Sequence, residues 1–394
     1  MINYIKMVKT ILLFIILIAS FNCNTELESG TDFIPPAQNS VVIWGQKQIE
    51  RVKKNFSAGE KKTTEYLKKI FSAANKMKDA EPDPQQFIIQ KKNIGMKEVQ
   101  RDRALAQAFA ADYVFNGNKK SLESSRQFIL AWASTYRTDR TETGYFTSVY
   151  QLVPFIWAYE LIRYSLSKED RYRIESFFRN VYQVAEANIT GEFSDAHAYG
   201  NHWSYHVYTI SAIGFLLNDE KIIKRAEEVY NEQIDWNLFP GGTPRNFYGH
   251  APKGKEIIER FERCGVADKY FEKSTYDWIN RDALGYHIIS IERLLWAGWF
   301  AENSGRKWFS KKGKQGMMLA DAFDLLIQFT NKTHKEFANT CIEGDEEKEN
   351  ESWVKQPGDV FRALASASLL HERFAKWENT TYGSHTQLLE ITGK

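Results

Sequence analysis

Apolar residues recur at helical spacing along almost the whole chain, and this periodicity limits the possible folds more than any other feature. Between residues 48 and 79, for example, Val52, Phe56, Tyr66 and Ile70 share one predicted helix face. Further stretches of helical length run at about 95–116, 120–136, 146–165, 168–189, 202–217, 219–236, 283–303, 314–331 and 359–378. Alternation with a period of two is scarce, so the sequence predicts an all-α protein.

Short polar links join neighbouring predicted helices. Asn116-Gly117-Asn118 and Asn218-Asp219 are brief enough to favour antiparallel pairs. Ser167 and Asn201 stand where helix N-caps are expected. About ten or more helices in hairpins indicate an α/α toroid, that is, an incomplete barrel. A TPR-like solenoid is the alternative, although no repeat of 34 residues is present.

The N-terminus has the features of an export signal. Lys6 and Lys9 precede a short apolar run, and Cys23 follows that run directly. Residues 1–23 therefore resemble a bacterial lipoprotein signal with lipidation at Cys23, which implies a periplasmic or outer-membrane protein that contacts the membrane only through the lipid. Plain secretion and an uncleaved anchor are the alternatives. We expect residues 24–40 to form a tether and residues 41–394 a single domain.

The composition of the chain limits the range of possible binding partners. The chain has 52 Lys and Arg against 50 Asp and Glu, so it lacks the broad basic field that nucleic-acid binding needs. Aromatic residues make up 14% of the chain, which suits either a carbohydrate cleft or a large core. Cys264 and Cys341 are able to pair, but no Cys and His pattern indicates zinc. We therefore expect no metal and no cofactor.

The densest polar and aromatic cluster is Gly200-Asn201-His202-Trp203-Ser204-Tyr205-His206. Asn201 and His202 lie at a predicted helix start, where the positive end of the helix dipole favours an anionic group. His202 and His206 share a helix face, but Trp203 between them excludes the HExxH zinc pattern. The alternative is an ordinary N-cap followed by hydrogen-bonded histidines.

Three other segments combine polar and aromatic residues. The first, Tyr276 to His287, contains Arg281 and Tyr286, which an irregular turn at Gly285 would let face one cleft. The second, Lys332 to Asn339, contains His334, and the third begins with Tyr150 and Gln151 at the start of an apolar helix. Each of these segments is also explained by a charged helix end or a buried helix.

Together these segments resemble the alginate-lyase group of polysaccharide lyases over most of residues 90–345. Asn201-His202 resembles the group's Asn-His motif, and Asp277-Trp278 with Arg281-Asp282-Ala283-Leu284-Gly285-Tyr286-His287 resembles its D-F-x-x-R-D-A-L-x-Y-H block. Thr333-His334-Lys335-Glu336-Phe337 resembles a T-H-x-E-F block. Trp278 replaces a Phe, and Gly285 stands where a His is common. The resemblance implies an α/α toroid that cleaves a 1,4-linked polyuronate.

The reaction implied is β-elimination, and the residue types suit it. Asn201, His202 and Arg281 would neutralise the uronate carboxylate, so that charge from the C5 carbanion spreads into it. Tyr286 would act as acid and base, with His202 as the alternative base. The candidate substrate-binding residues are Lys92, Tyr150, Gln151, Tyr205, His206, His250 and His334.

The substrate expected is an acidic polysaccharide such as alginate, polymannuronate or glucuronan. Residue types alone leave the choice of uronate and the choice of endo or exo cleavage open. An α/α-barrel glycoside hydrolase would need two carboxylates across one cleft, and no clear pair is present. A non-catalytic glycan-binding surface lipoprotein would explain the lipid anchor and the aromatic residues, but not the Asn-His and Arg-Tyr clusters.

Overall fold

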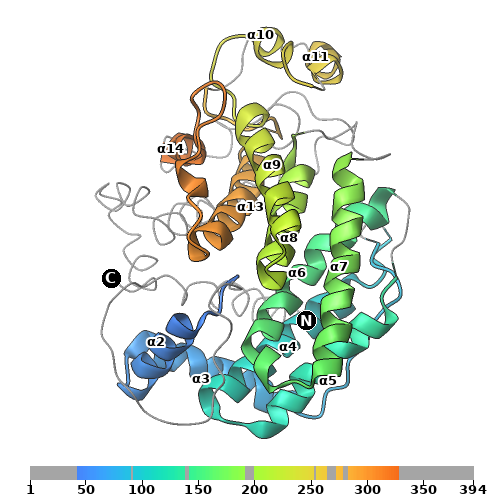
Figure 1. Cartoon of the computed structure of the whole chain (residues 1–394), viewed down its shortest axis with the longest axis vertical. Coiled ribbons are helices and arrows are strands. Elements are labelled where there is room, and N and C mark those ends of the chain that lie inside the picture. Colours follow the sequence, from blue (N-terminus) through green and yellow to red (C-terminus); the bar gives the residue numbers. More distant parts are fainter. Residues whose placement is uncertain are drawn as a thin grey trace. The chain divides into compact units, whose positions relative to one another are not determined.

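The computed structural model describes residues 42–89, 92–137, 142–190, 199–252, 254–263, 272–277 and 283–327 (Figure 1). Within these ranges the regular secondary structure is entirely helical, apart from two isolated β-bridges, Ile89 with Ile94 and Leu238 with Thr275. The helices are α2 (Gln46–Ser57), α3 (Lys61–Lys76), α4 (Met96–Asn116), α5 (Lys119–Thr135), α6 (Glu142–Ile162), η2 (Arg163–Ser165), α7 (Lys168–Thr190), α8 (Asn201–Leu217), α9 (Glu220–Trp236), α10 (Pro244–Tyr248), α11 (Gly254–Arg263), α13 (Ala283–Asn303), η4 (Trp308–Ser310) and α14 (Leu319–Ile327). The all-α prediction is confirmed.

One predicted stretch, 48–79, is two helices rather than one. Gly59 has a φ of +70°, a left-handed conformation that glycine adopts without steric cost, and it follows the last turn of α2. Glu60 then accepts a hydrogen bond from the backbone N–H of Thr63 at 2.7 Å and caps α3. The rings of Phe56 and Phe71 meet edge to face, 5.7 Å apart, so the two helices form a hairpin.

Helices α4, α5, α7, α8, α9 and α13 agree with the predicted ranges to within one residue at each end. Helix α6 begins four residues and ends three residues before the predicted 146–165, and α10 and α11 were not predicted. Helix α13 spans the predicted 283–303, whereas α14 is shorter than the predicted 314–331. Gly316, with a φ of +79°, belongs to a loop before α14, and Asp321 caps that helix by accepting from the Met318 N–H at 2.7 Å. The helix predicted at 359–378 and the acidic segment 343–358 lie outside the described residues.

The residues fall into two compact units, and the division passes through α7 and α8. The first unit contains residues up to 186 together with 212–220, and the second contains 187–211 and the residues from 221 onward. The expectation that residues 41–394 form one domain stays a prediction.

In the first unit, α4 and α5 form an antiparallel hairpin around Gly117. The hydroxyl of Ser121 donates to Asp112 near the turn, and Trp132 Nε1 donates to Asp102 at the far end, at 2.8 Å. Contacts therefore pair residues in reverse order along the two helices. This arrangement confirms the antiparallel pairing predicted from the short Asn116-Gly117-Asn118 link.

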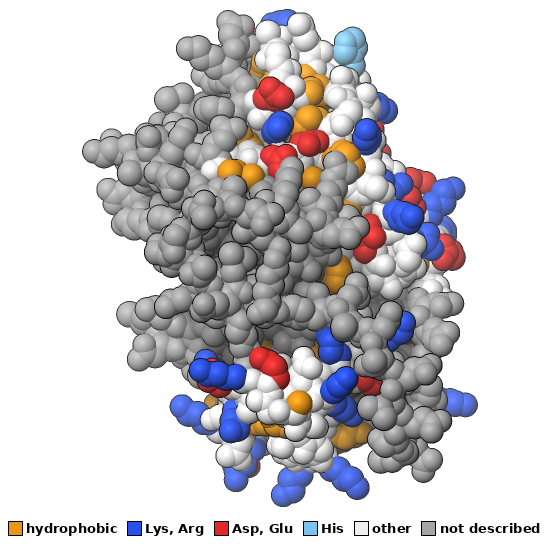
Figure 2. All heavy atoms as spheres, turned by 90° about the vertical axis from the view of Figure 1, so that its left-hand side faces the viewer, with side chains coloured by type: hydrophobic (Ala, Val, Ile, Leu, Met, Phe, Trp, Pro, Cys, Tyr) orange, Lys and Arg blue, Asp and Glu red, His pale blue; other side chains and the backbone are white. Residues whose placement is uncertain are grey.

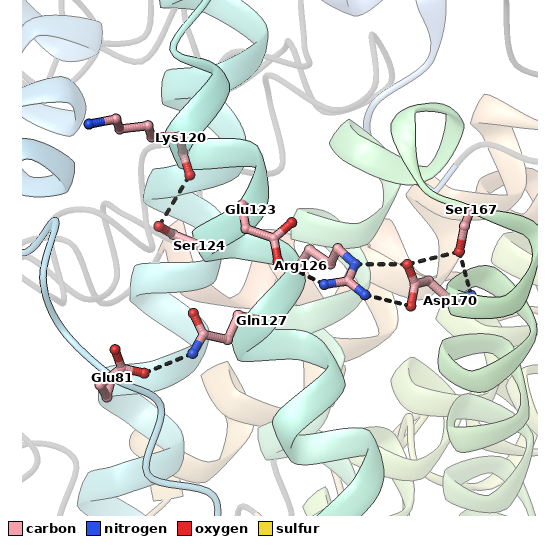
Figure 3. Close-up of polar contacts among 8 residues, drawn as sticks. All are labelled: Glu81, Lys120, Glu123, Ser124, Arg126, Gln127, Ser167 and Asp170. Atoms are coloured by element: carbon pink, nitrogen blue, oxygen red, sulfur yellow. Dashed lines mark hydrogen bonds and ion pairs between the residues drawn. The ribbon is translucent and has the colours of Figure 1, made fainter.

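Helix α7 starts with the predicted cap, because Ser167 Oγ accepts from the Asp170 N–H at 3.1 Å. Arg126 of α5 grips the carboxylate of Asp170 with two hydrogen bonds, of 2.7 and 3.0 Å (Figure 3). Figure 3 also shows Gln127 of α5 reaching Glu81, at 2.7 Å, in the segment before α4. These contacts join α5 to the start of α7 and to the segment that precedes α4.

The first described residues are fastened to α6 by one buried carboxylate. Glu160, which is 7% exposed, accepts backbone N–H groups of Val42, Ile43 and Trp44 at 2.5, 2.9 and 3.2 Å. Burial raises the pKa of Glu160 to about 7, against the lowering effect of these three donors. The segment Val42–Trp44 is therefore held by a carboxyl group that titrates near neutral pH.

Basic and acidic side chains share the described part of the face in Figure 2, and basic ones are more numerous at its lower end. The α2–α3 hairpin carries the exposed lysines Lys47, Lys53, Lys54, Lys61, Lys68, Lys69 and Lys76.

None of the helices in the described ranges is both long enough and apolar enough to cross a bilayer.

Candidate active site

The second unit contains the start of α8, where the sequence predicts Asn201 and His202. Tyr199 has a φ of +63°, so the chain turns sharply before the helix, and its ring lies 5.4 Å from that of Trp203. The carbonyl of Gly200 accepts the N–H groups of Trp203 and Ser204, at 3.0 and 3.3 Å. The helix thus begins at Asn201, one residue earlier than predicted, and Asn201 is its first residue rather than its N-cap.

The N-cap acceptor comes from a distant segment. The carboxylate of Asp277 accepts a hydrogen bond from the backbone N–H of Asn201. A carboxylate at a helix N-terminus is stabilised both by the unpaired N–H groups and by the helix dipole. Asn201 uses its backbone here, so its carboxamide takes no part in the contact. Asn201 is 6% exposed, and His202 is partly exposed.

Helix α13 lies beside α8 and runs parallel to it. Ser290 Oγ donates at 3.1 Å to the same Asp277 oxygen that accepts the Asn201 N–H. Further along both helices, Arg293 meets Tyr205, and the rings of Phe300 and Tyr208 lie 5.8 Å apart. Because these contacts follow the same order in both helices, the two N-terminal ends lie at the same end of the pair.

Tyr286 lies one helical turn before Ser290 on the same face of α13, because the two residues are four apart. Four residues rise by about 6 Å along the axis, so Tyr286 lies near the level of the start of α8. Its side chain is partly exposed rather than packed into the core. The structure therefore brings Tyr286 to the end of the helix pair where Asn201 and His202 lie.

His287, the next residue, is fully buried and bonded on both ring nitrogens. Its Nδ1 accepts the N–H of Thr275 at 3.1 Å, and its Nε2 lies 3.0 Å from the carbonyl oxygen of Ala322. Nε2 therefore carries the proton. Burial lowers the pKa of His287 to about 4, although the carbonyl of Ala322 opposes this shift. The neutral imidazole therefore links α13 to α14 and to the segment before Asp277.

Arg293 of α13 is placed between two tyrosines of α8. Its guanidinium carbon lies 4.7 Å from the ring centre of Tyr205 and 5.5 Å from that of Tyr208. Tyr205 is three residues after His202, so these two side chains share a face of α8. Sequence reasoning missed Arg293, because nothing in the local sequence pairs it with residues so far away.

His206 differs from His202 in its surroundings. It is 3% exposed, and burial lowers its pKa to about 3, so the ring is neutral at neutral pH. A neutral, buried imidazole does not offer a positive charge to a uronate. The i,i+4 spacing of the two histidines therefore gives one partly exposed and one enclosed ring.

Three predicted substrate-binding residues belong to the first unit. Tyr150 is partly exposed on α6, and Gln151 next to it is 4% exposed. Arg103 of α4, which sequence reasoning missed, donates from Nη1 to Oε1 of Gln151 at 2.5 Å and to its carbonyl at 3.2 Å. Lys92 is exposed, in the turn that the bridge between Ile89 and Ile94 closes.

His250, in the second unit, is exposed just after α10. Arg281, His334 and Cys23 lie outside the described residues, as do Cys264 and Cys341. Among the residues that the structure describes, no three His, Cys, Asp or Glu side chains gather in a way that would hold a metal ion.

Comparison with known proteins shows the family to which the chain belongs. The family model for alginate lyase matches residues 61–337, which is well over half of the chain. The chain therefore belongs to the alginate lyase family and is a polysaccharide lyase. No curated protein matches its sequence.

Solved structures with the same fold are distant in sequence. A crystal structure of an alginate lyase from Bacteroides ovatus is 14% identical, with a TM-score of 0.58 over 84% of this chain and 92% of that one. Alginate lyase A1-III from Sphingomonas species A1 is 12% identical, with a TM-score of 0.53 over 83% of this chain and 87% of that one. At these identities the likeness shows the fold alone, and it confirms the predicted α/α toroid.

Alginate lyase A1-III also matches as two variants, each complexed with a tetrasaccharide. In one variant a histidine is replaced by alanine, with 12% identity and a TM-score of 0.52. In the other a tyrosine is replaced by phenylalanine, with 11% identity and the same TM-score. Both matches cover 80% of this chain and 84% of the other.

Proposed function

We propose that this lyase cleaves a 1,4-linked polyuronate by β-elimination at the N-terminal end of the α8–α13 pair. The observation that carries the proposal is the shared contact of Asp277 with Asn201 and Ser290. This contact aligns the start of α8 with the turn of α13 that follows Tyr286. Two groups suited to a carboxylate and one phenol therefore belong to the same end of one unit.

The substrate carboxylate is the first chemical problem. Removing the C5 proton of a uronate beside an ionised carboxylate creates negative charge that has to spread into that group. The Asn201 carboxamide and the His202 ring, at the positive end of α8, are suited to bind the carboxylate, and Arg281 would add a full positive charge. A single donor of this kind typically changes the rate by about 10² to 10³.

Proton transfer is the second problem. A base takes the C5 proton, a double bond forms between C4 and C5, the C4–O4 bond breaks, and an acid protonates O4. Tyr286 serves as both groups when the C5 proton and O4 lie on one face of the sugar. His202 is the alternative base, with Tyr286 as the acid. General acid–base assistance contributes roughly 10² to 10⁴ in rate.

The comparisons support the substrate class and the residue types. The relatives are named alginate lyases, and one was crystallised with a tetrasaccharide. The two residue types exchanged in the variants of that relative, histidine and tyrosine, are the types that we assign to acid–base chemistry here. The proposed substrate is therefore alginate, polymannuronate or glucuronan.

The deciding experiment is to incubate the protein with each of these three polymers. The ultraviolet absorbance of the unsaturated product and the number of new reducing ends are followed together. Elimination produces both signals in equal amounts. Reducing ends without the absorbance would instead indicate hydrolysis, and binding without either signal would indicate a glycan-binding lipoprotein.

We also propose that the chain is exported and anchored by a lipid on Cys23. The basic residues, the short apolar run and the cysteine that follows it support this proposal. The mass of the mature N-terminal peptide tests it. An acylated peptide that begins at Cys23 is expected, and an unmodified cysteine would contradict the proposal.

A further inference from the structure

We propose that Asp277 is a positioning residue that sets the start of α8 against the Tyr286 face of α13. The inference rests on the proposed function, because it assigns Asp277 the task of holding the groups that would bind and deprotonate the uronate. Asp277 itself is 2% exposed. It therefore acts on the reaction through Asn201 and α13 rather than by touching the sugar.

One carboxylate oxygen of Asp277 accepts hydrogen bonds from two helices. Asp277 Oδ2 accepts both the backbone N–H of Asn201 and, at 3.1 Å, the hydroxyl of Ser290. These donors belong to different helices, and a third segment of the chain supplies the acceptor. A shift of either helix by about 1 Å would weaken one of the two bonds, and a misplacement of that size costs catalysis as much as about 100-fold.

The segment that carries Asp277 is itself held in place by hydrogen bonds. The N–H of Tyr276 lies 2.9 Å from Oδ1 of Asn237 and 3.0 Å from its carbonyl oxygen. Asn237 Nδ2 and Ser204 Oγ both donate to Oε1 of Gln233, at 3.0 and 3.1 Å. Since Ser204 belongs to the first turn of α8, these bonds close a ring from α8 through α9 and back to Asp277.

The same segment is also bonded to α13. The N–H of Thr275 donates to Nδ1 of His287, next to Tyr286. Asp277 and Thr275 thus hold two successive turns of α13, one through Ser290 and one through His287. The segment Ser274–Asp277 is therefore a buried bracket that fixes both helices at the end where the site lies.

The test compares Asp277→Ala, Asp277→Asn and Ser290→Ala with a matched control, Asp112→Ala. Asp112 is also buried, at 3% exposure, and its Oδ2 also accepts a serine hydroxyl, that of Ser121 at 2.5 Å. It belongs to the first unit and has no place in the proposed site. Removal of either carboxylate opens a similar cavity. In Asp112→Ala it also breaks the bonds from the side-chain amides of Asn116 and Asn118 to Asp112.

We expect Asp277→Ala to lower kcat by about 100-fold, because the helices lose their common acceptor. Its KM is expected to stay within roughly threefold, since no group that touches the sugar has been removed. Asp277→Asn keeps one acceptor oxygen and should stay within about tenfold of the parent kcat. Ser290→Ala removes the bond to α13 and leaves the bond to Asn201, so its kcat should fall between those of the parent and Asp277→Ala.

A second readout does not depend on turnover. Hydrogen exchange in the peptide that covers residues 200–206 should speed up in Asp277→Ala and stay unchanged in Asp112→Ala. Equal kcat values for Asp277→Ala and Asp112→Ala would overturn the proposal, as would an Asp277→Asn protein as slow as Asp277→Ala. If Asp277→Ala does not fold, the decision passes to Asp277→Asn and Ser290→Ala.

These results are separable from a failure of the proposed function. If the parent protein does not cleave polyuronates by elimination, the function falls, whereas the exchange measurement still tests the bracket. If the parent cleaves them and the Asp277 variants match the control, only the positioning role falls.

Discussion

The guanidinium of Arg293 lies 4.7 Å from the centre of the Tyr205 ring, and its Nη2 lies 3.5 Å from the Tyr205 hydroxyl. This contact holds an aromatic ring that shares a face of α8 with His202. A cation over an aromatic face contributes about 0.5–2 kcal/mol, depending on how far it is desolvated. Arg293 therefore orients Tyr205, which we predict to bind the sugar unit next to the uronate that reacts.

Replacing Arg293 by Met should loosen Tyr205 and raise KM by about 3- to 30-fold, the range that corresponds to the energy of the contact. The matched control is Lys314→Met, because Lys314 Nζ lies 5.1 Å from the ring centre of Trp236 at the surface. Steady-state kinetics on a polyuronate give both KM values. An unchanged KM in the Arg293 variant would remove Tyr205 from the binding surface or show that it needs no support.

Tyr286→Phe should abolish most turnover, with a loss in kcat of about 10² to 10⁴, because the phenol is the proposed acid. Binding should persist, since the ring remains. Calorimetric titration with an oligouronate and the rate of product absorbance measure the two effects separately. Tyr172→Phe, at a position 74% exposed, is the control. Full activity of Tyr286→Phe would transfer the proton chemistry to another residue.

Gln151→Glu should change stability and substrate binding in opposite directions. The new carboxylate would face Arg103 at the place where Oε1 now accepts a 2.5 Å hydrogen bond, and such a charged pair is stronger than the present contact. We expect a higher melting temperature but a KM at least several-fold higher, because the added negative charge repels a uronate. A melting temperature and KM that both stay constant would contradict the role of Gln151 in binding.

Glu160 should make stability depend on pH. Its pKa is about 7 in the folded protein and about 4.5 in the unfolded chain. The contribution of the neutral carboxyl is therefore complete below pH 4.5 and is lost as the pH rises through 7. Linkage gives a loss of about 3 kcal/mol over this interval.

The measurement is urea unfolding of the parent and of Glu160→Gln across this pH range. The variant cannot ionise at this position, so the stability difference between the two proteins should shift in favour of the variant as pH rises. A difference that stays constant with pH would show that folding does not raise the pKa of Glu160. The bonds to Val42, Ile43 and Trp44 make the N-terminal segment the part expected to respond first.

The helices were predictable where the apolar pattern and the capping residues agree, as in α7. The irregular turn expected at Gly285 was wrong, because Gly285 is part of the regular helix α13. The pattern also continues through Gly59, so the break between α2 and α3 was not visible, since only the positive φ of that glycine ends the helix. A local pattern reports which face is apolar. It does not report where the backbone leaves helical geometry.

The residues of the candidate site also fall into those that the sequence indicated and those that only the structure shows. Asn201, His202 and Tyr286 stand in short runs of polar and aromatic residues, so the sequence singled them out. Asp277 was visible as part of a motif, but its bond to Asn201 joins residues 76 positions apart. Ser290, Arg293 and Arg103 were assigned no role, because each acquires its role only when distant helices meet.

The contacts of His287 with Thr275 and Ala322 also determine which way α13 is turned about its own axis. The Thr275 N–H and the Ala322 carbonyl grip the imidazole from different segments of the chain, so α13 cannot roll without breaking both. Consecutive residues of a helix are 100° apart in azimuth. A rotation of α13 by one residue would place Gly285 or His287 where Tyr286 now stands. The contacts of the His287 ring therefore keep the phenol of Tyr286 at this position.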